Sequence, residues 1–481
     1  MKKTIRFILL SIAILSCGGE KNLVNESETK IDAEEISQYL QGEINTHQIP
    51  GLGVAVIKNG KVLYEDYFGL ASIENQDSVD AHTVFRIYSA TKLMTATGVF
   101  QLVENQKIAL KDTISQYISG LPEAWRNVKI EHLLTHSSGI PDIIRFDNSL
   151  SDEELINQMA KEGMDFEPGS RFWYNQTNYW FLARIIEQVE GTSFEEMILG
   201  NQFIDAGGQV FFSSNSLDYI PHRANKYEYN FDAGKLEKVN NNDGERAHPG
   251  NGINITLPAF IEWNQRLDNQ LLLNEKTKDL MWKPFNYQNG VDNFRHGWGD
   301  YSANGIESVG FTGGGVSGFR KFPSEGLTII YLSNGYKYFP VHNRIINHIA
   351  GLVDSTLINH ESLNEERVIS NFLQNPIKQA VENYYSIKKE NPDSDFEGML
   401  NSLGYAVMKE GRTKDAIEIF EINASEHPNS GNAYDSLAEG YFKDGQFDKS
   451  IQSYKKSLEL DNENNNARVM IDIIQKQLEG K

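Results

Sequence analysis

Ser89 and Lys92 stand three positions apart in FRIYSATKLMTA (residues 85–96), where an extended apolar run changes into a helix-like one. A serine hydroxyl is a weak nucleophile until a neighbouring base takes its proton. A lysine one helical turn further on lies on the same side, and burial would lower its pKa enough to make it that base. The first turn of a helix also directs N–H groups at a developing oxyanion. The pair is therefore either a nucleophile with its base or an exposed serine one turn before a lysine.

Spacing alone does not decide between these two interpretations. Ser-x-x-Lys occurs four times, beginning at Ser27, Ser89, Ser386 and Ser453. Ser27 lies in a polar segment with no predicted fold, and the last two fall on helices of a predicted repeat. Only Ser89 lies within sequence that predicts a large folded domain.

The helices and strands of that domain must hold Ser89 and Lys92 in position. A helix-like stretch from residue 36 precedes two β-type runs around Asn59–Gly60, whose residue types favour the positive φ of a tight hairpin turn. Strand-rich sequence recurs only at residues 295–335, before a predicted helix at 341–353, while residues 90–270 show mostly helical patterns. We expect an α+β fold: one antiparallel sheet built from both ends of the domain, flanked by helices, with a helical subdomain inserted.

The N-terminus predicts export. A basic lead, a short apolar run and a small-residue boundary make residues 1–16 a secretory signal rather than a membrane span. The single cysteine, Cys17, ends the run, and ILSC resembles the bacterial lipobox. We expect a lipoprotein anchored through Cys17, periplasmic or on the cell surface, with residues 17–35 as a flexible tether. The alternative is a plain signal peptide with a chance cysteine.

The C-terminal region carries an internal repeat. Residues 400–429 align with the sequence 34 residues further on, and this period resembles the tetratricopeptide repeat. We place a linker at 353–375 and an all-α repeat domain at 376–481, which could bind a protein partner. Two generic amphipathic hairpins are the alternative. The alignment pairs Leu403 with Leu437, Gly411 with Gly445 and Phe420 with Tyr454.

Four segments in order carry a family resemblance. FRIYSATKLMTATGVFQLVENQKIALKDTISQYI (85–118), IEHLLTHSSGIPD (130–142), the Tyr-x-Asn-like segment at 166–191 and GFTGGGVSGFR (310–320) are similar to landmarks of the serine β-lactamase and penicillin-binding-protein superfamily. The resemblance covers residues 36–352 and is to the branch with class C β-lactamases, D-alanyl-D-alanine carboxypeptidases and related esterases.

The resemblance implies a role for each matching residue. Ser89 would be the acylated nucleophile, Lys92 its activator and Tyr174 the group that passes protons, although a phenol would need the lysine nearby to act as a base. The oxyanion hole would use the backbone N–H of Ser89 and one from the strand that contains Gly313, Gly314 and Gly315.

Two positions depart from the family pattern. Gln176 stands where the second motif has asparagine; it can make the same amide contacts one methylene further out, unless Asn175 turns inward. The third motif lacks its lysine or histidine, because its position falls on Thr312 or Phe311 depending on the alignment. The cation that would hold a substrate carboxylate is therefore missing, which favours an esterase or amidase with a neutral acyl substrate.

Other functions have less support. The net charge of −21 argues against a nucleic-acid partner. His132 and His136 could share a metal, but no third ligand is evident and we expect them to cap and pack a helix end. We expect no metal and no cofactor.

The sequence thus predicts a lipid-anchored serine hydrolase that acts on a small-molecule or peptide ester or amide. The alternatives are a non-catalytic peptidoglycan- or protein-binding protein on the same scaffold, and a chain whose repeats are the functional part.

Overall fold

The computed structural model describes residues 31–479. The predictions for the signal peptide, Ser27 and Cys17 fall outside these residues. The first helix, α1 (Ala33–His47), starts at the N-cap Asp32, whose carboxylate accepts from the N–H groups of Glu34 and Glu35. The helix therefore begins inside the predicted tether, before the domain boundary expected at residue 36.

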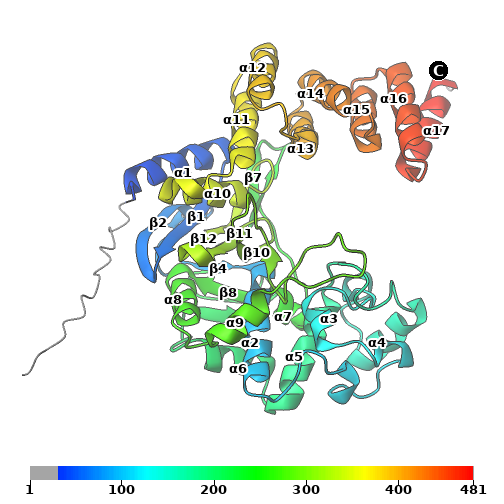
Figure 1. Ribbon diagram of the computed structural model, residues 1–481. Helices are drawn as coiled ribbons and strands as arrows, with labels where there is room; N and C mark the ends of the chain where they lie inside the picture. The colour runs from blue at the N-terminus through cyan, green and yellow to red at the C-terminus, as the bar shows by residue number, and fades with distance from the viewer. Residues whose placement is uncertain (1–30, 480–481) are drawn as a thin grey trace, which may run out of the picture. The chain divides into compact units, whose positions relative to one another are not determined.

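A seven-stranded antiparallel sheet forms the centre of the domain (Figure 1). Its order is β3-β2-β1-β12-β11-β10-β9. The strands are β1 (Gly51–Lys58), β2 (Lys61–Ser72), β3 (Asp77–Ser78), β9 (Gly299–Asp300), β10 (Val309–Gly313), β11 (Ser317–Phe322) and β12 (Leu327–Ser333).

The two ends of the domain meet within this sheet. Asn59 and Gly60 turn the first hairpin with φ of 51° and 76°, as their residue types predict. β1 then pairs with β12, with Ala55 opposite Ile330. The expected α+β fold, with one sheet assembled from both ends, is confirmed.

Helices cover both faces of the sheet. Ala55 belongs to the large core beneath the sheet, and a Cβ built on Gly53, two residues earlier, would meet Leu257 of α8 (Leu257–Asp268). A Cβ on Gly318 of β11 would instead meet Ile346 of α10 (His342–Val353). Because successive strand residues point to opposite faces, the central strands β1, β11 and β12 are buried on both sides, whereas β2 and β3 at one end of the sheet are partly or fully exposed.

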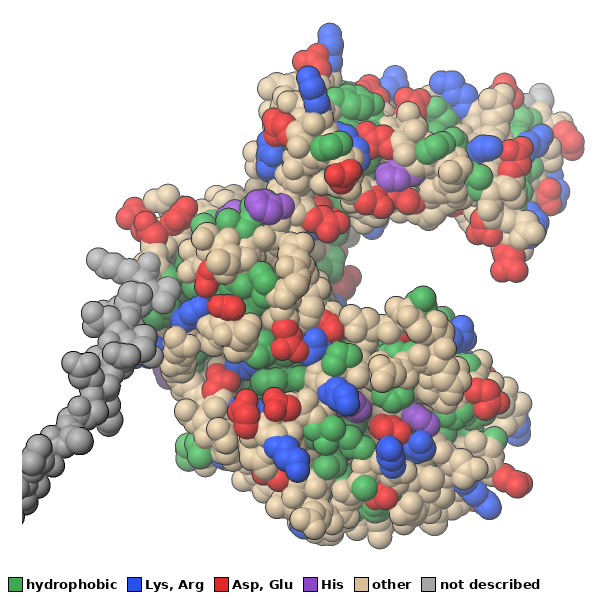
Figure 2. Space-filling view, in the orientation of Figure 1, with side chains coloured by type: hydrophobic (Ala, Val, Ile, Leu, Met, Phe, Trp, Pro, Cys, Tyr) green, Lys and Arg blue, Asp and Glu red, His purple; other side chains and the backbone are tan. Residues whose placement is uncertain are grey.

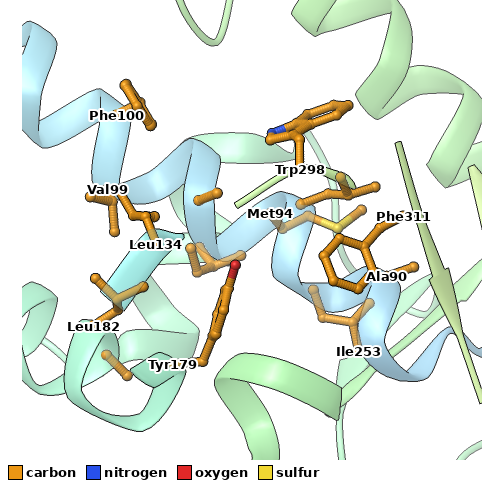
Figure 3. Packing of buried hydrophobic residues seen from close by; sticks show 14 of the residues in the cluster. Ala90, Met94, Val99, Phe100, Leu134, Tyr179, Leu182, Ile253, Trp298 and Phe311 are labelled. Carbon is orange, nitrogen blue, oxygen red and sulfur yellow. The ribbon is translucent and has the colours of Figure 1, made fainter. Parts of the chain in front are cut away.

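The helix after Ser89 is buried on all sides. α2 (Thr91–Glu104) buries Met94 and Phe100 completely, and Leu134, Tyr179 and Trp298 surround it (Figure 3). A helix that is apolar all round belongs in the centre of a fold. The helices around it and in the inserted region are α3 (Ile130–Leu134), α4 (Asp152–Glu162), α5 (Thr177–Glu190), α6 (Phe194–Gln202), α7 (His248–Asn251) and α9 (Glu275–Trp282).

The inserted region also contains β5, β6, β7 and β8, which the sequence patterns did not predict and which form two small sheets with β4 and β13. One small sheet has the order β4-β8-β5 and another the order β13-β6-β7. Both contain strands of at most four residues, too short to give an alternating pattern. They are β4 (Val84–Arg86), β5 (Val210–Phe212), β6 (Tyr227–Asn230), β7 (Lys235–Lys238), β8 (Ile253–Thr256) and β13 (Gly335–Tyr336).

The C-terminal region is helical. Two successive helix pairs start 34 residues apart (397 and 431, 413 and 447). The predicted linker at 353–375 is largely a helix, because Val368 and Phe372 of α11 are buried in the core shared with these pairs. The helices are α11 (His360–Gln374), α12 (Ile377–Glu390), α13 (Glu397–Lys409), α14 (Thr413–Glu426), α15 (Gly431–Lys443), α16 (Phe447–Leu460) and α17 (Asn465–Glu479).

Acidic and basic side chains are interspersed over the face shown in Figure 2. Among residues 31–479, no helix has the length and apolar character needed to cross a membrane.

Candidate active site

Ser89 lies in a single 3₁₀ turn, η1 (Tyr88–Ala90), between β4 and α2. The preceding residue, Tyr88, has a φ of +47°, which is unfavourable for a bulky side chain and persists only where its surroundings hold it. Two hydrogen bonds hold Ile87, the residue before Tyr88. Its N–H donates to Ile253 O (3.0 Å), and Ser317 Oγ donates to its carbonyl (2.7 Å). The serine is therefore held in a strained turn, partly exposed at the start of a buried helix.

Lys92 is completely buried one turn below this serine. Its Nζ donates to Gln176 Oε1 (3.0 Å) and to Gly250 O (2.8 Å). Burial lowers the pKa of Lys92 to about 7, against a smaller opposing effect from the carboxylate of Asp142. Near neutral pH a large fraction of this amine is thus unprotonated and able to accept a proton.

Tyr174 is the side chain that contacts the candidate nucleophile. Its Oη donates a hydrogen bond of 2.8 Å to Ser89 Oγ, and its ring centroid lies 4.9 Å from Lys92 Nζ. Partial burial raises the pKa of Tyr174 above its ordinary value, although hydrogen bonds with Ser89 and Gln176 lower it. The structure brings the three predicted catalytic residues together, with the tyrosine rather than the lysine bonded to the serine.

The residues after Tyr174 point in opposite directions. Gln176 turns toward Lys92, whereas the side chain of Asn175 is buried and donates to Ile140 O (2.6 Å). The glutamine therefore occupies the inward position of the second motif, and the alternative of an inward Asn175 is wrong. Asp142 Oδ1 accepts from the Gln176 N–H (3.1 Å) and fixes this turn.

His136 supports the same segment from behind. Its ring is fully buried with its centroid 4.5 Å from that of Tyr174, and its Nδ1 accepts from the Asn175 N–H (3.2 Å). Burial and the charge of Lys92 hold the pKa of this histidine well below its ordinary value, so it is neutral. His132 accepts from the Lys129 N–H at the start of α3. Both histidines thus pack and cap, as expected.

The glycine-rich end of β10 lies directly against the serine. A Cβ on Gly313 would fall 2.0 Å from Ile87 O and 2.8 Å from the backbone nitrogen of Ser89. Gly314 and Gly315 have φ of 56° and 73°, which glycine adopts without strain. Only a glycine lets this strand come close enough for its N–H groups and that of Ser89 to face one bound oxygen.

Phe311, rather than Thr312, faces the candidate catalytic residues. The Phe311 ring is 6.4 Å from that of Tyr174 and 5.9 Å from Lys92 Nζ, and the side chain is buried. Thr312 points to the other side of the strand, and within the described part of the chain its hydroxyl has no hydrogen-bond partner. The position of the family cation is thus occupied by an aromatic ring.

Sequence reasoning missed two site residues. Gly250 of α7 supplies the carbonyl that holds Lys92, and a Cβ there would lie 2.9 Å from Nζ. The carboxylate of Asp142 raises the pKa of Lys92 against the effect of burial, and it accepts a hydrogen bond from the backbone N–H of Gln176. The glycine-rich HPGNG (248–252) could have signalled a close backbone approach. Asp142 ends the segment IEHLLTHSSGIPD, which carries part of the family resemblance, but it was assigned no role.

Comparison with known proteins identifies the family. A family model described as Beta-lactamase matches residues 34–351. The chain belongs to this beta-lactamase family. Penicillin-binding protein 4* of Bacillus subtilis (strain 168) is 27% identical over 313 residues, covering 60% of this chain and 68% of that protein.

Solved structures show the beta-lactamase family fold for the same region. The octameric penicillin-binding protein homologue from Pyrococcus abyssi has a TM-score of 0.60 and 22% identity, covering 71% of this chain and 82% of its own. EstCE1, described as a hydrolase with promiscuous acyltransferase activity, has a TM-score of 0.55 and 20% identity, covering 67% and 98%.

Proposed function

We propose that this beta-lactamase family member is a serine hydrolase that cleaves an ester or amide through an acyl-enzyme on Ser89. The observation that carries the proposal is the 2.8 Å hydrogen bond between Tyr174 Oη and Ser89 Oγ beside the buried Lys92. An exposed, unengaged serine would need neither the strained turn nor a buried amine with a pKa of about 7.

The chemistry proceeds in two steps. Ser89 Oγ attacks the carbonyl carbon while its proton passes through Tyr174 toward the neutral Lys92, and the N–H groups beside Gly313 stabilise the oxyanion. Collapse breaks the bond to the leaving alcohol or amine, which takes the proton. A water then attacks the acyl-enzyme by the same proton path, releasing the acid and restoring Ser89.

The acyl group of the substrate is proposed to be neutral where it meets β10. Phe311 offers an apolar surface there and Thr312 a free hydroxyl, neither of which compensates a carboxylate charge. These features support an esterase or amidase over a β-lactamase or carboxypeptidase, and EstCE1, whose fold this chain shares, is itself described as a hydrolase.

Covalent labelling tests the proposal. The full chain is treated with a fluorophosphonate and, separately, with a labelled penicillin, and the adduct is located by mass spectrometry. We expect a phosphonate adduct at Ser89 that Ser89→Ala abolishes, with much slower reaction with penicillin. A folded protein that neither probe labels would refute catalysis.

The absent cation favours a second candidate, a non-catalytic protein that binds peptidoglycan or another protein on the same scaffold. Loss of the recognition group while the fold is kept is its supporting observation. This candidate predicts no adduct with either probe, so the same experiment separates the two functions.

We also propose that the chain is an exported lipoprotein and that its C-terminal helices are tetratricopeptide repeats that bind a protein partner. The first rests on the lipobox-like ILSC at Cys17, and the second on the 34-residue offset of the two helix pairs. Incorporation of labelled palmitate that Cys17→Ser abolishes would support the anchor.

A further inference from the structure

A pocket separate from the candidate active site lies next to the turn that carries Ser89. It has a volume of about 310 Å³ and is bounded by β4, η1, the loop at 216–226 and the end of β7. We call it the basic pocket, because four of its lining residues are Arg86, Arg223, Lys226 and Lys238.

The charge of this pocket is opposite to that of the chain. The protein carries a net charge of −21, yet among the described residues that line the pocket Asp218 is the one acidic side chain. Both of its oxygens are already engaged, Oδ2 by Ser213 Oγ (2.7 Å) and Oδ1 by Asn215 Nδ2 (3.0 Å). Outside the lining, Asp243 pairs with Arg86 (2.6 Å) and Glu228 pairs with Lys226 (3.2 Å). Arg223 and Lys238 are therefore the lining cations without an ion pair among residues 31–479.

Two arginines in the pocket have donors to spare. Arg86 is buried and pairs with Asp243 through Nη2 (2.6 Å), but its Nη1 has no hydrogen-bond partner among the residues that the structure describes. Arg223 donates to Asn215 O (2.9 Å) and forms no ion pair within residues 31–479. Burial and the charge of Arg86 lower the pKa of Arg223. Like charges held together at a half-buried site are unfavourable unless an anion lies between them.

The pocket shares a residue with the candidate active site. Arg86 and Lys226 lie 4.4 Å and 5.4 Å from the ring centroid of Tyr88, which also lines the pocket. The same ring would be 2.8 Å from a Cβ on Gly314, and Tyr88 directly precedes Ser89. One wall of the pocket is therefore the residue that directly precedes the candidate nucleophile.

We propose that the basic pocket binds the carboxylate or phosphate group of a small molecule. The unpaired Arg86 Nη1, the guanidinium of Arg223 and the ammonium of Lys238 supply charged donors. The anion is carried either by the acyl substrate, which rests on the proposed hydrolase function, or by a separate ligand.

Direct binding tests the pocket without any requirement for activity. Inorganic phosphate and, separately, succinate are titrated calorimetrically into the full-length Ser89→Ala variant at constant ionic strength. We expect saturable binding of at least one probe, weakened about tenfold or more by adding Arg223→Gln. Lys238 is exposed, so Lys238→Gln repeats the test without disturbing packing, and Lys276→Gln is the matched surface control.

The outcomes are exclusive. Saturable binding that both pocket variants weaken and Lys276→Gln preserves supports the pocket. Absence of binding by both probes, or binding that either pocket variant leaves unchanged, overturns it. Because Ser89 is absent from these proteins, failure here is independent of failure of the hydrolase proposal.

Two esters then assign the source of the anion. 4-Nitrophenyl butyrate is neutral, whereas the mono-4-nitrophenyl ester of glutarate ends its acyl chain in a carboxylate. If the substrate carries the anion, Arg223→Gln raises KM for the glutarate ester alone. If a separate ligand carries it, phosphate changes butyrate hydrolysis in the parent chain and not in Arg223→Gln.

Discussion

The attacking and recognising halves of the candidate site are built differently. In the attacking half Tyr174 Oη donates to Ser89 Oγ (2.8 Å), and Lys92 Nζ donates to the Gly250 carbonyl (2.8 Å) and to Gln176 Oε1 (3.0 Å). In the recognising half Phe311 packs inward and the hydroxyl of Thr312 is unbonded among the residues described. The chemistry of acyl transfer constrains the first half whatever the substrate is, whereas the second half is free to follow the substrate.

Replacing Lys92 with methionine should break the attacking half with the largest effect. The thioether fills a similar volume but accepts no proton, so we expect a loss of about 10²–10⁴-fold in the rate of phosphonate labelling at Ser89. The labelling reaction is quenched at successive times, and the labelled fraction is measured by intact-mass spectrometry. Lys321→Met is the matched control, because Lys321 is equally buried but pairs with Asp268 away from the site. A Lys92→Met chain that is folded and labelled at the parent rate would exclude the lysine as base.

The pH dependence of labelling at Ser89 is a second test of the attacking half. The pKa of Lys92 is lowered to about 7, so the amine is protonated and inactive below that pH and neutral above it. The labelling rate should therefore fall about tenfold for each pH unit below 7 and become level above it. Rates measured between about pH 5 and 11 test this. A profile that rises only above pH 9 would assign the titration to a phenol instead.

Much of the scaffold that holds the attacking half followed from local signals. Asn59–Gly60 marked a hairpin, and the apolar runs at both ends of the domain marked the sheet. The grouping of Ser89, Lys92 and Tyr174 followed from the resemblance rather than from spacing, since Ser-x-x-Lys alone was ambiguous. The positive φ of Tyr88 had no signal, because it is imposed by tertiary contacts.

The recognising half was much less predictable. Whether Phe311 or Thr312 faced inward depended on strand register, and a shift of one residue reverses every side chain. The basic pocket was not predicted, because its four cations come from β4, the loop at 216–226 and β7, which are far apart in the sequence. The short strands that place two of them gave no periodic pattern.

Adding a cation to β10 should change which substrate is recognised. Phe311→Lys places an ammonium where the aromatic ring lies, and a charge-assisted contact with the penicillin carboxylate contributes about 1.5–3 kcal/mol. At a pH at which the Lys92 amine is fully neutral, we expect the acylation rate with penicillin to rise about tenfold or more. Phe311→Met removes the ring without adding charge and serves as the control. An equal gain in both variants would show that space rather than charge limits penicillin.

Gln176→Asn should have the smallest effect and tests whether the two halves are separable. The amide of Gln176 belongs by position to the recognising half, but its Oε1 accepts from Lys92 Nζ at 3.0 Å. Shortening the side chain by one methylene breaks this contact, while the Gly250 carbonyl still holds the lysine at 2.8 Å. A neutral hydrogen bond contributes about 0.5–1.5 kcal/mol, so we expect a loss of roughly 3–10-fold in kcat/KM.

The division of this loss locates the glutamine. If Gln176 mainly orients the base, kcat falls and the midpoint of the pH profile moves from about 7, because Lys92 has lost one of its two acceptors. If it mainly contacts substrate, KM rises and the midpoint stays. Gln188→Asn, on the far side of α5 and at the surface, controls for the shortened amide. A rise in KM alone would show that Gln176 belongs only to the recognising half. A shifted midpoint of the pH profile would show that this side chain also acts on the base of the attacking half.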